Sequence, residues 1–464
     1  MNYPVWNLPI LGGSLTVAII AIIHVLISHL AIGGGAFLAV AEIWALRSSD
    51  GDRIRKWLRK FATFFLVYTT VLGAVTGVGI WFSIQLASPE ATSLLIHQYV
   101  FAWATEWVTF IGELTILYLY YYGWKTNSER MQVFLAVVYF VIAWFSLFII
   151  NGILTFMLTP GGWTLENRDI FQGFFNPGYF PSLLIRTLIM FLTAGLAGIL
   201  IATRIEDDDA FKIRIIRFCA KWVVPGAVLI PVLGLWYFST LPESTVTLFH
   251  SGVSGLNDGK MEGLNRFFWL SVTAFMLITV GAAVAAWKPA AVHTASAVAL
   301  LLIAQAGFLG GEFFREMARK PHVIKDVLYS NSLWQKDAAD AEWMKEPFFD
   351  HTKWEPKLTP MTSAHGEWMY RLQCASCHTL DGYRSLMERT AAWTPSFGVR
   401  FLEKLEAQGV MPPFQGSLDD RAALTSYFLS LHGRNETPDE VLRIFKEDEA
   451  KKSSAAASAA KEVK

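Results

Sequence analysis

Eight long apolar segments constrain the fold of this chain more than any other feature. Of the 464 residues, 53% are hydrophobic, and the mean hydropathy is +0.37. Each segment reaches the length of about 20 residues that a helix needs to cross the hydrocarbon core of a membrane. The sequence therefore predicts an all-α integral membrane protein with a bundle of eight transmembrane helices, over residues 10–46, 61–87, 99–123, 132–159, 181–204, 217–239, 267–287 and 291–315.

The distribution of basic residues predicts the orientation of these helices. Cytoplasmic loops are enriched in Lys and Arg, and residues 88–98 contain neither. The N-terminus is therefore expected on the outer face, and eight crossings return residue 316 onward to that face. The first apolar run lacks a basic leader and is too long for a cleavable signal peptide. The basic residues lie between segments one and two (Arg47, Arg53, Arg55, Lys56, Arg59, Lys60) and between five and six (Arg204, Lys212, Arg214, Arg217, Lys221).

Residues 374–378 read Cys-Ala-Ser-Cys-His, which is the C-x-x-C-H attachment sequence of a c-type haem. Cys374 and Cys377 would hold the haem covalently, and His378 would be an axial ligand of the iron. The alternatives are an accidental pair of cysteines or a zinc site, and a zinc site lacks a second pair of ligands within reach. Because haem is attached to such motifs outside the cytoplasm, the motif agrees with the orientation that the basic residues predict.

The C-terminal part is expected to be a small class I-like cytochrome c domain over residues 362–434. Met411, in the loop 409–414, is the candidate for the second axial ligand of the haem c, and thioether ligation suits an electron carrier. The alternative is a core methionine beside a Pro-Pro turn. A final amphipathic helix has Leu424, Tyr427, Phe428 and Leu431 at helical spacing.

This domain organisation leaves three further segments. Residues 1–321 would form the membrane domain that binds haem, and residues 322–361 a linker along the outer face. Residues 435–464 form a charged tail that we expect to be disordered, since an Ala/Ser/Lys/Glu mixture buries little apolar surface. The remaining cysteine, Cys219, is expected to be an ordinary helix residue.

Ionisable side chains inside the apolar segments are the second set of candidates, because each costs about 2.5–3.5 kcal/mol on insertion scales. His24 and His29 are five residues apart, which turns them about 140° from each other on a helix, so they need not face one site. Glu106 and Glu113 are seven residues apart and share one stripe, which indicates a proton path or charge compensation beside a metal. The alternative for each is a structural, hydrogen-bonded group.

The eighth segment ends in a second acidic pair, Glu312 and Glu316, one helical turn apart. Either acid could ligate iron or simply solvate the helix end at the outer boundary.

Three stretches resemble subunit I of the cytochrome bd oxygen reductases: residues 23–26 with 33–42, residues 110–114 with 121–124, and residues 311–321. The last is similar to the family's G-W-x-x-x-E-x-G-R-Q-P-W box, with Gly311, Glu316, Arg319 and Pro321 on its Gly, Glu, Arg and Pro. The resemblance covers roughly residues 10–330. It implies that His24 and Glu316 ligate two b- or d-type haems, and that haem contacts or a proton pathway involve Glu106, Glu113, Glu312, His29 and Arg319.

The departures from that family concern electron entry. The family holds a low-spin b haem with a histidine on the fifth helix and a methionine just inside the seventh, where this chain has Arg186 and Phe268. Neither side chain ligates iron. Residues 240–266 are too short for the family's quinol-binding loop, and the linker and cytochrome c replace its ninth helix. The interval from Glu106 to Glu113 is one residue shorter than the family's usual pair.

The resemblance thus implies a cytochrome-c-fused branch of the bd superfamily that lacks the quinol site. We expect a terminal oxidase subunit of the bacterial inner membrane, with the N-terminus and the cytochrome domain periplasmic. It would pass electrons from a soluble periplasmic cytochrome c through one covalent haem c to the two membrane haems, where O₂ is reduced to water. The expected partners are a second membrane subunit resembling bd subunit II and the lipid bilayer, without nucleic acid.

Two alternatives stay open. The chain could be a membrane electron-transfer cytochrome that activates no gas. It could also reduce nitric oxide, for which His29 would mark an altered iron site or an added metal.

Overall fold

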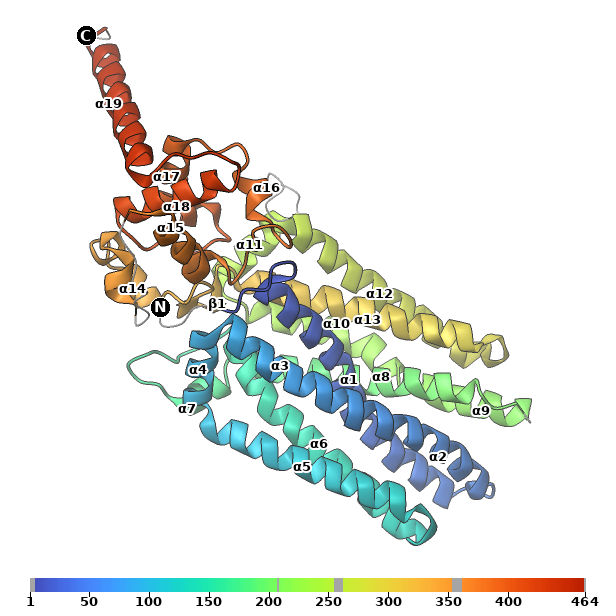
Figure 1. Cartoon of the computed structure of the whole chain (residues 1–464). Helices are drawn as coiled ribbons and strands as arrows, with labels where there is room; N and C mark the ends of the chain where they lie inside the picture. The colour runs from blue at the N-terminus through green and yellow to red at the C-terminus, as the bar shows by residue number, and fades with distance from the viewer. Residues whose placement is uncertain (1–4, 207, 254–261, 353–360, 463–464) are drawn as a thin grey trace. The chain divides into compact units, whose positions relative to one another are not determined.

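The computed structural model describes residues 5–206, 208–253, 262–352 and 361–462 (Figure 1). The chain divides into two compact units. Residues 18–80 and 95–319 form the first, which we call the bundle unit. Residues 1–17, 81–94 and 320–464 form the second, the C-terminal unit. Each is described by itself below.

The eight predicted spans are confirmed: eight helices in the described ranges are long and apolar enough to cross a membrane. Three are built from consecutive elements. The second consists of α2, the π-helical turn η1 and α3, the third ends in the short turn η2 after α5, and the sixth consists of α9 and α10. The spans are α1 (Gly12–Leu46), α2 (Gly51–Val67) with η1 (Tyr68–Gly73) and α3 (Ala74–Ala87), α5 (Val100–Tyr122), α6 (Glu129–Phe156), α8 (Tyr179–Ala202), α9 (Asp209–Ala220) with α10 (Val224–Ser239), α12 (Glu262–Trp287) and α13 (Thr294–Arg319).

Short elements join the spans. They are α4 (Pro89–Gln98), η2 (Gly123–Lys125), α7 (Ile170–Phe174), α11 (Glu243–Val253) and η3 (Pro289–Ala291).

The second span begins ten residues earlier than predicted. The basic residues from Arg53 to Lys60 lie inside α2, not in a loop before it. They share the helix with a buried face formed by Ile54, Trp57, Leu58 and Phe61. An apolar-run criterion misses such a helix end, because only one side of it is apolar.

The sixth span also begins earlier than predicted. Asp208 precedes α9, and its Oδ1 accepts a hydrogen bond from the backbone N–H of Phe211 at 2.9 Å. This side-chain cap satisfies one of the backbone donors that every helix start leaves unpaired, so the helix starts in a charged segment.

The turns that join α1 to α2, α5 to α6 and α8 to α9 lie at one end of the bundle unit (Figure 1). The basic clusters gather there. Arg53 pairs with Asp208 at 2.6 Å, and Arg214 pairs with Asp50. Charged side chains are thus concentrated at an end of the bundle, as the distribution of Lys and Arg in the sequence predicts.

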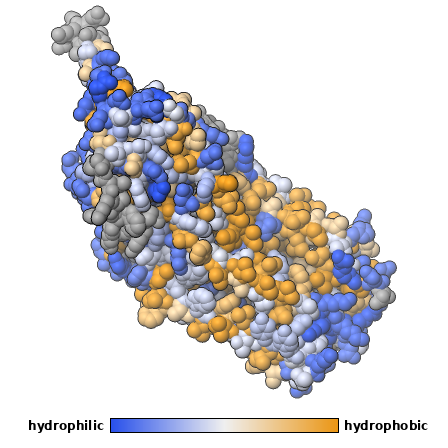
Figure 2. Space-filling view, viewed as in Figure 1, coloured by the Kyte–Doolittle hydropathy of each residue, from blue (hydrophilic) through white to orange (hydrophobic). Residues whose placement is uncertain are grey.

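The sides of the bundle unit are hydrophobic, and Figure 2 shows a broad apolar surface over its helices. Many large apolar side chains point outward, for example Phe101, Val108 and Trp287. Inside, aromatic rings such as Phe37, Phe61 and Trp222 pack on one another. An apolar exterior over an equally apolar core is the pattern of a protein that lipid surrounds.

The C-terminal unit has a core of its own, which includes Met369, Leu402 and Phe428. Its helices are α15 (Ser363–Met369), the π-helical turn η6 (Tyr370–Cys374), α16 (Leu386–Thr390), α17 (Pro395–Glu403), η7 (Leu405–Gln408), α18 (Leu418–Ser430) and α19 (Pro438–Glu462). Ser417 and Asp420 form a capping box that starts α18.

The segment predicted as a linker carries structure. In its described part, residues 322–352, two antiparallel strands, β1 (His322–Ile324) and β2 (Leu328–Tyr329), are followed by α14 (Gln335–Ala338), η4 (Trp343–Lys345) and η5 (Phe348–His351). Phe348 is fully buried in the core of the C-terminal unit. Residues 353–360 lie outside the described residues. The segment therefore packs as part of the unit because its aromatic residues find an apolar core.

The tail also differs from the expectation of disorder. Residues 438–462 form helix α19, and Val441 on its first turn is fully buried. Arg400 on α17 pairs with Glu449 on α19. The low apolar content of the tail hid this helix, whose first turns pack on the core of the unit through Val441, Leu442 and Phe445.

Candidate haem sites

The C-x-x-C-H segment forms a single helical turn directly after η6. The backbone N–H groups of Cys377 and His378 both donate to the carbonyl oxygen of Cys374, at 3.1 and 3.0 Å. This turn holds the two thiols and the imidazole next to one another. A π-helical turn immediately before it is typical of functional sites.

His378 is prepared to bind a metal through Nε2. Its Nδ1 lies 2.9 Å from the carbonyl oxygen of Arg384, which only an Nδ1–H group can satisfy. Burial, as the largest cause, lowers the pKa of His378 to about 4, so the ring is neutral at pH 7. A ligating histidine usually donates its other ring N–H to such a carbonyl. The residues therefore fit a covalently attached haem with His378 as an axial ligand.

The loop that contains Met411 is tied to this motif. The Gln373 side chain donates from Nε2 to the Gln415 carbonyl at 2.8 Å, and its Oε1 accepts from the Gln415 backbone N–H at 3.2 Å. Gln373 directly precedes Cys374, and Gln415 follows Met411 by four residues. The structure thus brings the predicted ligand loop beside the haem motif, with Met411 half-buried.

In the bundle unit, His24 and His29 both lie on α1 but have different surroundings. The Nδ1 of His24 is 2.9 Å from Thr76 Oγ1, which itself donates to the Leu72 carbonyl. The threonine must therefore accept from His24, which leaves the lone pair on Nε2. Thr76 follows the π-helical turn η1, so this candidate site also adjoins a π-helical turn.

His29 is 2% exposed, and its Nδ1 is 2.6 Å from the carbonyl oxygen of Val25. Its Nε2 is buried and has no hydrogen-bond partner among the residues that the structure describes. Leaving such an atom unpaired costs about 1–3 kcal/mol. His29 thus resembles a ligand at least as closely as His24 does, which the spacing on the helix did not reveal.

Glu106 and Glu113 lie on one stripe of α5, as predicted. Glu113 is within hydrogen-bonding reach of Ser146 on α6 and is the electrostatic neighbour of Glu106. Tyr139 on α6 is close enough to Glu113 to sense its charge, and its hydroxyl donates to the Ala31 carbonyl at 3.1 Å. Acids and hydroxyls from two helices thus form a polar group inside the bundle unit.

The acids of α13 differ from each other. Glu312 is 15% exposed and accepts two hydrogen bonds from Arg315, at 2.7 and 2.9 Å. Glu316 is 41% exposed and pairs with Arg319, whose Nη1 lies 3.5 Å from Met157 Sδ. Glu316 is therefore the more accessible carboxylate, and Glu312 is the more completely neutralised one.

Arg186 and Phe268, at the positions of the family's low-spin haem ligands, contact other protein side chains. Arg186 Nη2 is 3.8 Å from Glu312 Oε1, and its Nε donates to Ser182 at 3.4 Å. Phe268 packs edge-on against Phe249, with ring centroids 5.3 Å apart, and also contacts Phe314. Both positions are occupied by ordinary packing within the bundle unit.

One buried group was missed by the sequence reasoning. Glu42 on α1 is fully buried, accepts a hydrogen bond from Tyr120 at 3.0 Å, and lies 3.4 Å from Arg55 Nε. Arg55 also pairs with Glu129, at the start of α6. The rule that singles out acids inside apolar helices could have found Glu42, but its partner was assigned to a loop.

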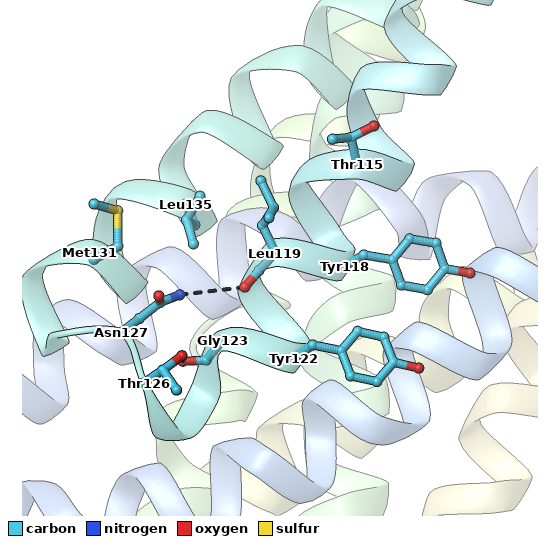
Figure 3. A pocket seen from close by; sticks show the side chains of 9 residues that line it. All are labelled: Thr115, Tyr118, Leu119, Tyr122, Gly123, Thr126, Asn127, Met131 and Leu135. Atoms are coloured by element: carbon cyan, nitrogen blue, oxygen red, sulfur yellow. Dashed lines mark hydrogen bonds between the residues drawn. The ribbon is translucent and has the colours of Figure 1, made fainter.

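An open groove lies at the end of the α5–α6 hairpin, with Tyr118, Tyr122, Met131 and Leu135 in its lining (Figure 3). Asn127 Nδ2 donates to the Leu119 carbonyl at 3.4 Å across it. None of the predicted haem ligands or acids lines this groove, so it is not the candidate site.

A sequence profile of the family described as cytochrome bd terminal oxidase subunit I matches residues 14–241. Residues 14–241, just under half of the chain, are thus similar to this family. They include His24, Glu106, Glu113 and Arg186, whereas α12 and α13, with Phe268, Glu312 and Glu316, lie beyond the match. No curated protein matches the chain.

The fold agrees with this assignment. The chain is similar to "The structure of bd oxidase from Geobacillus thermodenitrificans", with a TM-score of 0.59 and 16% sequence identity over 67% of this chain and 87% of that chain. At this identity the likeness shows the fold alone. The chain is therefore a multi-pass membrane protein with a fold like that of this bd oxidase, and residues 14–241 are similar to bd oxidase subunit I.

Proposed function

We propose that this chain is the haem-bearing subunit of a cytochrome-c-linked oxygen reductase. Soluble periplasmic cytochrome c would donate electrons to the C-terminal domain, and the bundle would deliver them to O₂ for reduction to water. The observation that carries this proposal is the turn of Cys374 to His378, with His378 Nδ1 on a backbone carbonyl and Gln373 bound to the loop of Met411.

Haem supplies the electron transfer and the oxygen chemistry, and the protein's residues hold and surround it. Cys374 and Cys377 would attach one haem c, and His378 and Met411 would ligate its iron. In the bundle, His24 and Glu316 would hold the two b- or d-type haems. Glu113, with Glu106 beside it and Ser146 against it, holds and passes protons inside the bilayer.

Electron entry through a cytochrome c domain agrees with the residues at the two positions where the bd family ligates its low-spin haem. Arg186 is engaged with Glu312, and Phe268 lies among other aromatic rings. The segment expected to be too short for a quinol loop, residues 240–266, includes residues 254–261, which lie outside the described residues. The proposal therefore depends on Arg186 and Phe268 and not on that loop.

We place the chain in the bacterial inner membrane, with the N-terminus and the cytochrome c domain on the periplasmic side. The charged end of the bundle unit then faces the cytoplasm. A second membrane subunit resembling bd subunit II completes the enzyme, because the apolar sides of the bundle accept a helical partner as well as lipid.

The test is the haem content of the purified full-length protein and its oxidation of reduced cytochrome c with O₂. We expect covalent haem c together with two non-covalent haems. Replacing Cys374 and Cys377 with Ser should abolish the covalent haem and the oxidation of cytochrome c, but retain the optical bands of the membrane haems. Cys219→Ala, which changes a cysteine inside the bundle unit, is the matched control.

Glu316→Ala examines the bundle in the same preparation. A change in the membrane-haem bands with an unaltered haem c is expected. Protein whose only porphyrin is covalently bound, or a Glu316→Ala variant with every band unchanged, would contradict the proposal.

Nitric oxide reduction is the second candidate, and the unpaired Nε2 of His29 favours it as a sign of an altered iron site. Turnover with nitric oxide in place of O₂, from reduced cytochrome c, separates the two.

A further inference from the structure

Lys320 is a buried cation beside the haem c attachment motif. Lys320 is 8% exposed, and its Nζ lies 4.0 Å from Cys377 Sγ and 3.2 Å from Ser330 Oγ. All three residues belong to the C-terminal unit. The sequence motif did not predict this contact, because Lys320 precedes Cys377 by 57 residues.

The direction of these hydrogen bonds is fixed by chemistry. Ser330 Oγ donates its only hydrogen to the Pro321 carbonyl, at 2.6 Å. It can therefore only accept from Lys320, whose ammonium group is a donor without acceptor capacity. The same group also lies 4.0 Å from the Cys377 sulfur. Lys320 is thus anchored, and does not move freely as a surface lysine does.

The segment that holds Lys320 also contacts the loop of the proposed second ligand. Asn331, 4% exposed, donates from Nδ2 to the carbonyl oxygen of Pro413 at 3.2 Å. Its Oδ1 accepts from the backbone N–H of Leu333 at 3.3 Å. Residues 320–331 therefore touch both sides of the site, at Cys377 and two residues from Met411.

We propose that Lys320 raises the reduction potential of the haem c bound at Cys374 and Cys377. This inference rests on the proposed function, which supplies that haem. Oxidised haem carries one more positive charge than reduced haem, so a fixed cation nearby disfavours the oxidised state. The interaction is strong because Lys320 is shielded from water. In the protein interior the effective dielectric constant is low and salt screens charges little.

Two other cations act on the same region. Arg384 and Arg389 lie close enough to His378 to affect its charge, as Lys320 does. Arg389 is exposed and Arg384 is half-buried. The three side chains therefore form a graded set in which Lys320 is the most buried, and the effect of each on the haem should follow its burial.

The experiment is an optical redox titration of haem c in the purified full-length protein. Lys320→Gln should lower the potential by about 59 mV, which is a tenfold change in the one-electron equilibrium. Lys320→Arg should keep the wild-type value, because the charge remains. Arg389→Gln and Lys336→Gln, which remove exposed charges, should each shift it by much less than Lys320→Gln.

An unchanged potential in Lys320→Gln, with the haem still covalently attached, would overturn the inference. If that variant fails to attach haem, Ser330→Ala decides instead: it releases the anchor of Lys320 and should lower the potential in the same direction, whereas a wild-type value overturns the inference. Failure of the proposed function looks different, since the wild-type protein would then contain no covalent haem to titrate.

Discussion

The candidate sites of the two units adjoin the same kind of element but are assembled in opposite ways. In the C-terminal unit, η6 leads into Cys374, and the groups that orient His378 lie within ten residues of it. In the bundle unit, η1 leads into Thr76, whose partner His24 is 52 residues away. The first site is local in sequence, and the second depends on how helices pack.

The two units also satisfy their buried polar groups differently. The haem motif relies on neutral side chains bonded to backbone groups, such as Gln373 with Gln415. The bundle unit places charge against charge, as in Arg186, Glu312 and Arg315. Removing one member of a buried ion pair lowers the stability of the fold far more than removing one partner of a neutral hydrogen bond does. Substitutions in the two units should therefore differ in size.

The largest effect is expected for Glu312→Gln. This change removes the carboxylate that Arg186 and Arg315 share inside the bundle unit, and the free energy of unfolding should fall by about 3–5 kcal/mol. Combining it with Arg186→Met should recover part of the loss. Thermal unfolding of the protein in detergent measures both.

The matched control for this cycle is Glu447→Gln, which breaks the exposed pair with Arg443 on α19. It should cost no more than about 0.5 kcal/mol. A Glu312→Gln variant as mild as this control would show that the bundle unit does not depend on buried charge, and the contrast between the units would fail.

The same contrast decides what the sequence alone could predict. The eight spans and the haem motif follow from local signals, namely apolar length and a five-residue pattern. The start of α2 and the helix α19 were missed because their apolar patterns are one-sided or sparse. Such a segment becomes a stable helix only when it packs on a partner surface. Tertiary packing, not local propensity, decides such elements.

Among the candidate site residues, sequence named Glu312 but not its partner Arg315, and Cys377 but not Lys320. Both partners are common surface residue types whose burial depends on the fold. His29 was noticed, but only the structure shows that its Nδ1 bonds to Val25 and that no described residue pairs with its Nε2. Ligand types can be read from sequence, whereas their tautomers and neighbours require coordinates.

A smaller effect is expected for Gln373→Ala in the C-terminal unit. It removes the partner of both the N–H and the carbonyl of Gln415, which are buried, and should cost about 1–3 kcal/mol. It should also loosen the loop of Met411, which weakens the far-red absorption band of oxidised, methionine-ligated haem c.

Gln408→Ala, in η7 of the same unit, is the control for this change. If Gln373→Ala keeps the far-red band at full strength, the loop of Met411 does not depend on Gln373. The inference that Gln373 holds this loop beside the haem motif would then be wrong.

The smallest effect concerns acid, and it tests a buried carboxylate of the C-terminal unit, Asp420. Burial raises the pKa of Asp420, but hydrogen bonds from His365, from the Phe348 N–H and from Ser417 outweigh it and hold the pKa below its usual range. The unfolded chain, with an Asp pKa of about 3.9, then binds more protons than the folded one as the pH falls. Asp420 therefore stabilises the fold fully above about pH 5, and this contribution is lost as the pH drops through the folded-state pKa.

Asp420→Asn should be less stable than wild type at neutral pH and should converge with it in acid, because the substituted chain has no such proton to take up. Unfolding followed by the haem c absorbance across this pH range measures the difference, with the exposed neighbour Asp419→Asn as control. Parallel curves for wild type and Asp420→Asn would mean that Asp420 acts only through its shape and neutral hydrogen bonds. The C-terminal unit would then use no buried charge at this position, and its contrast with the bundle unit would be sharper still.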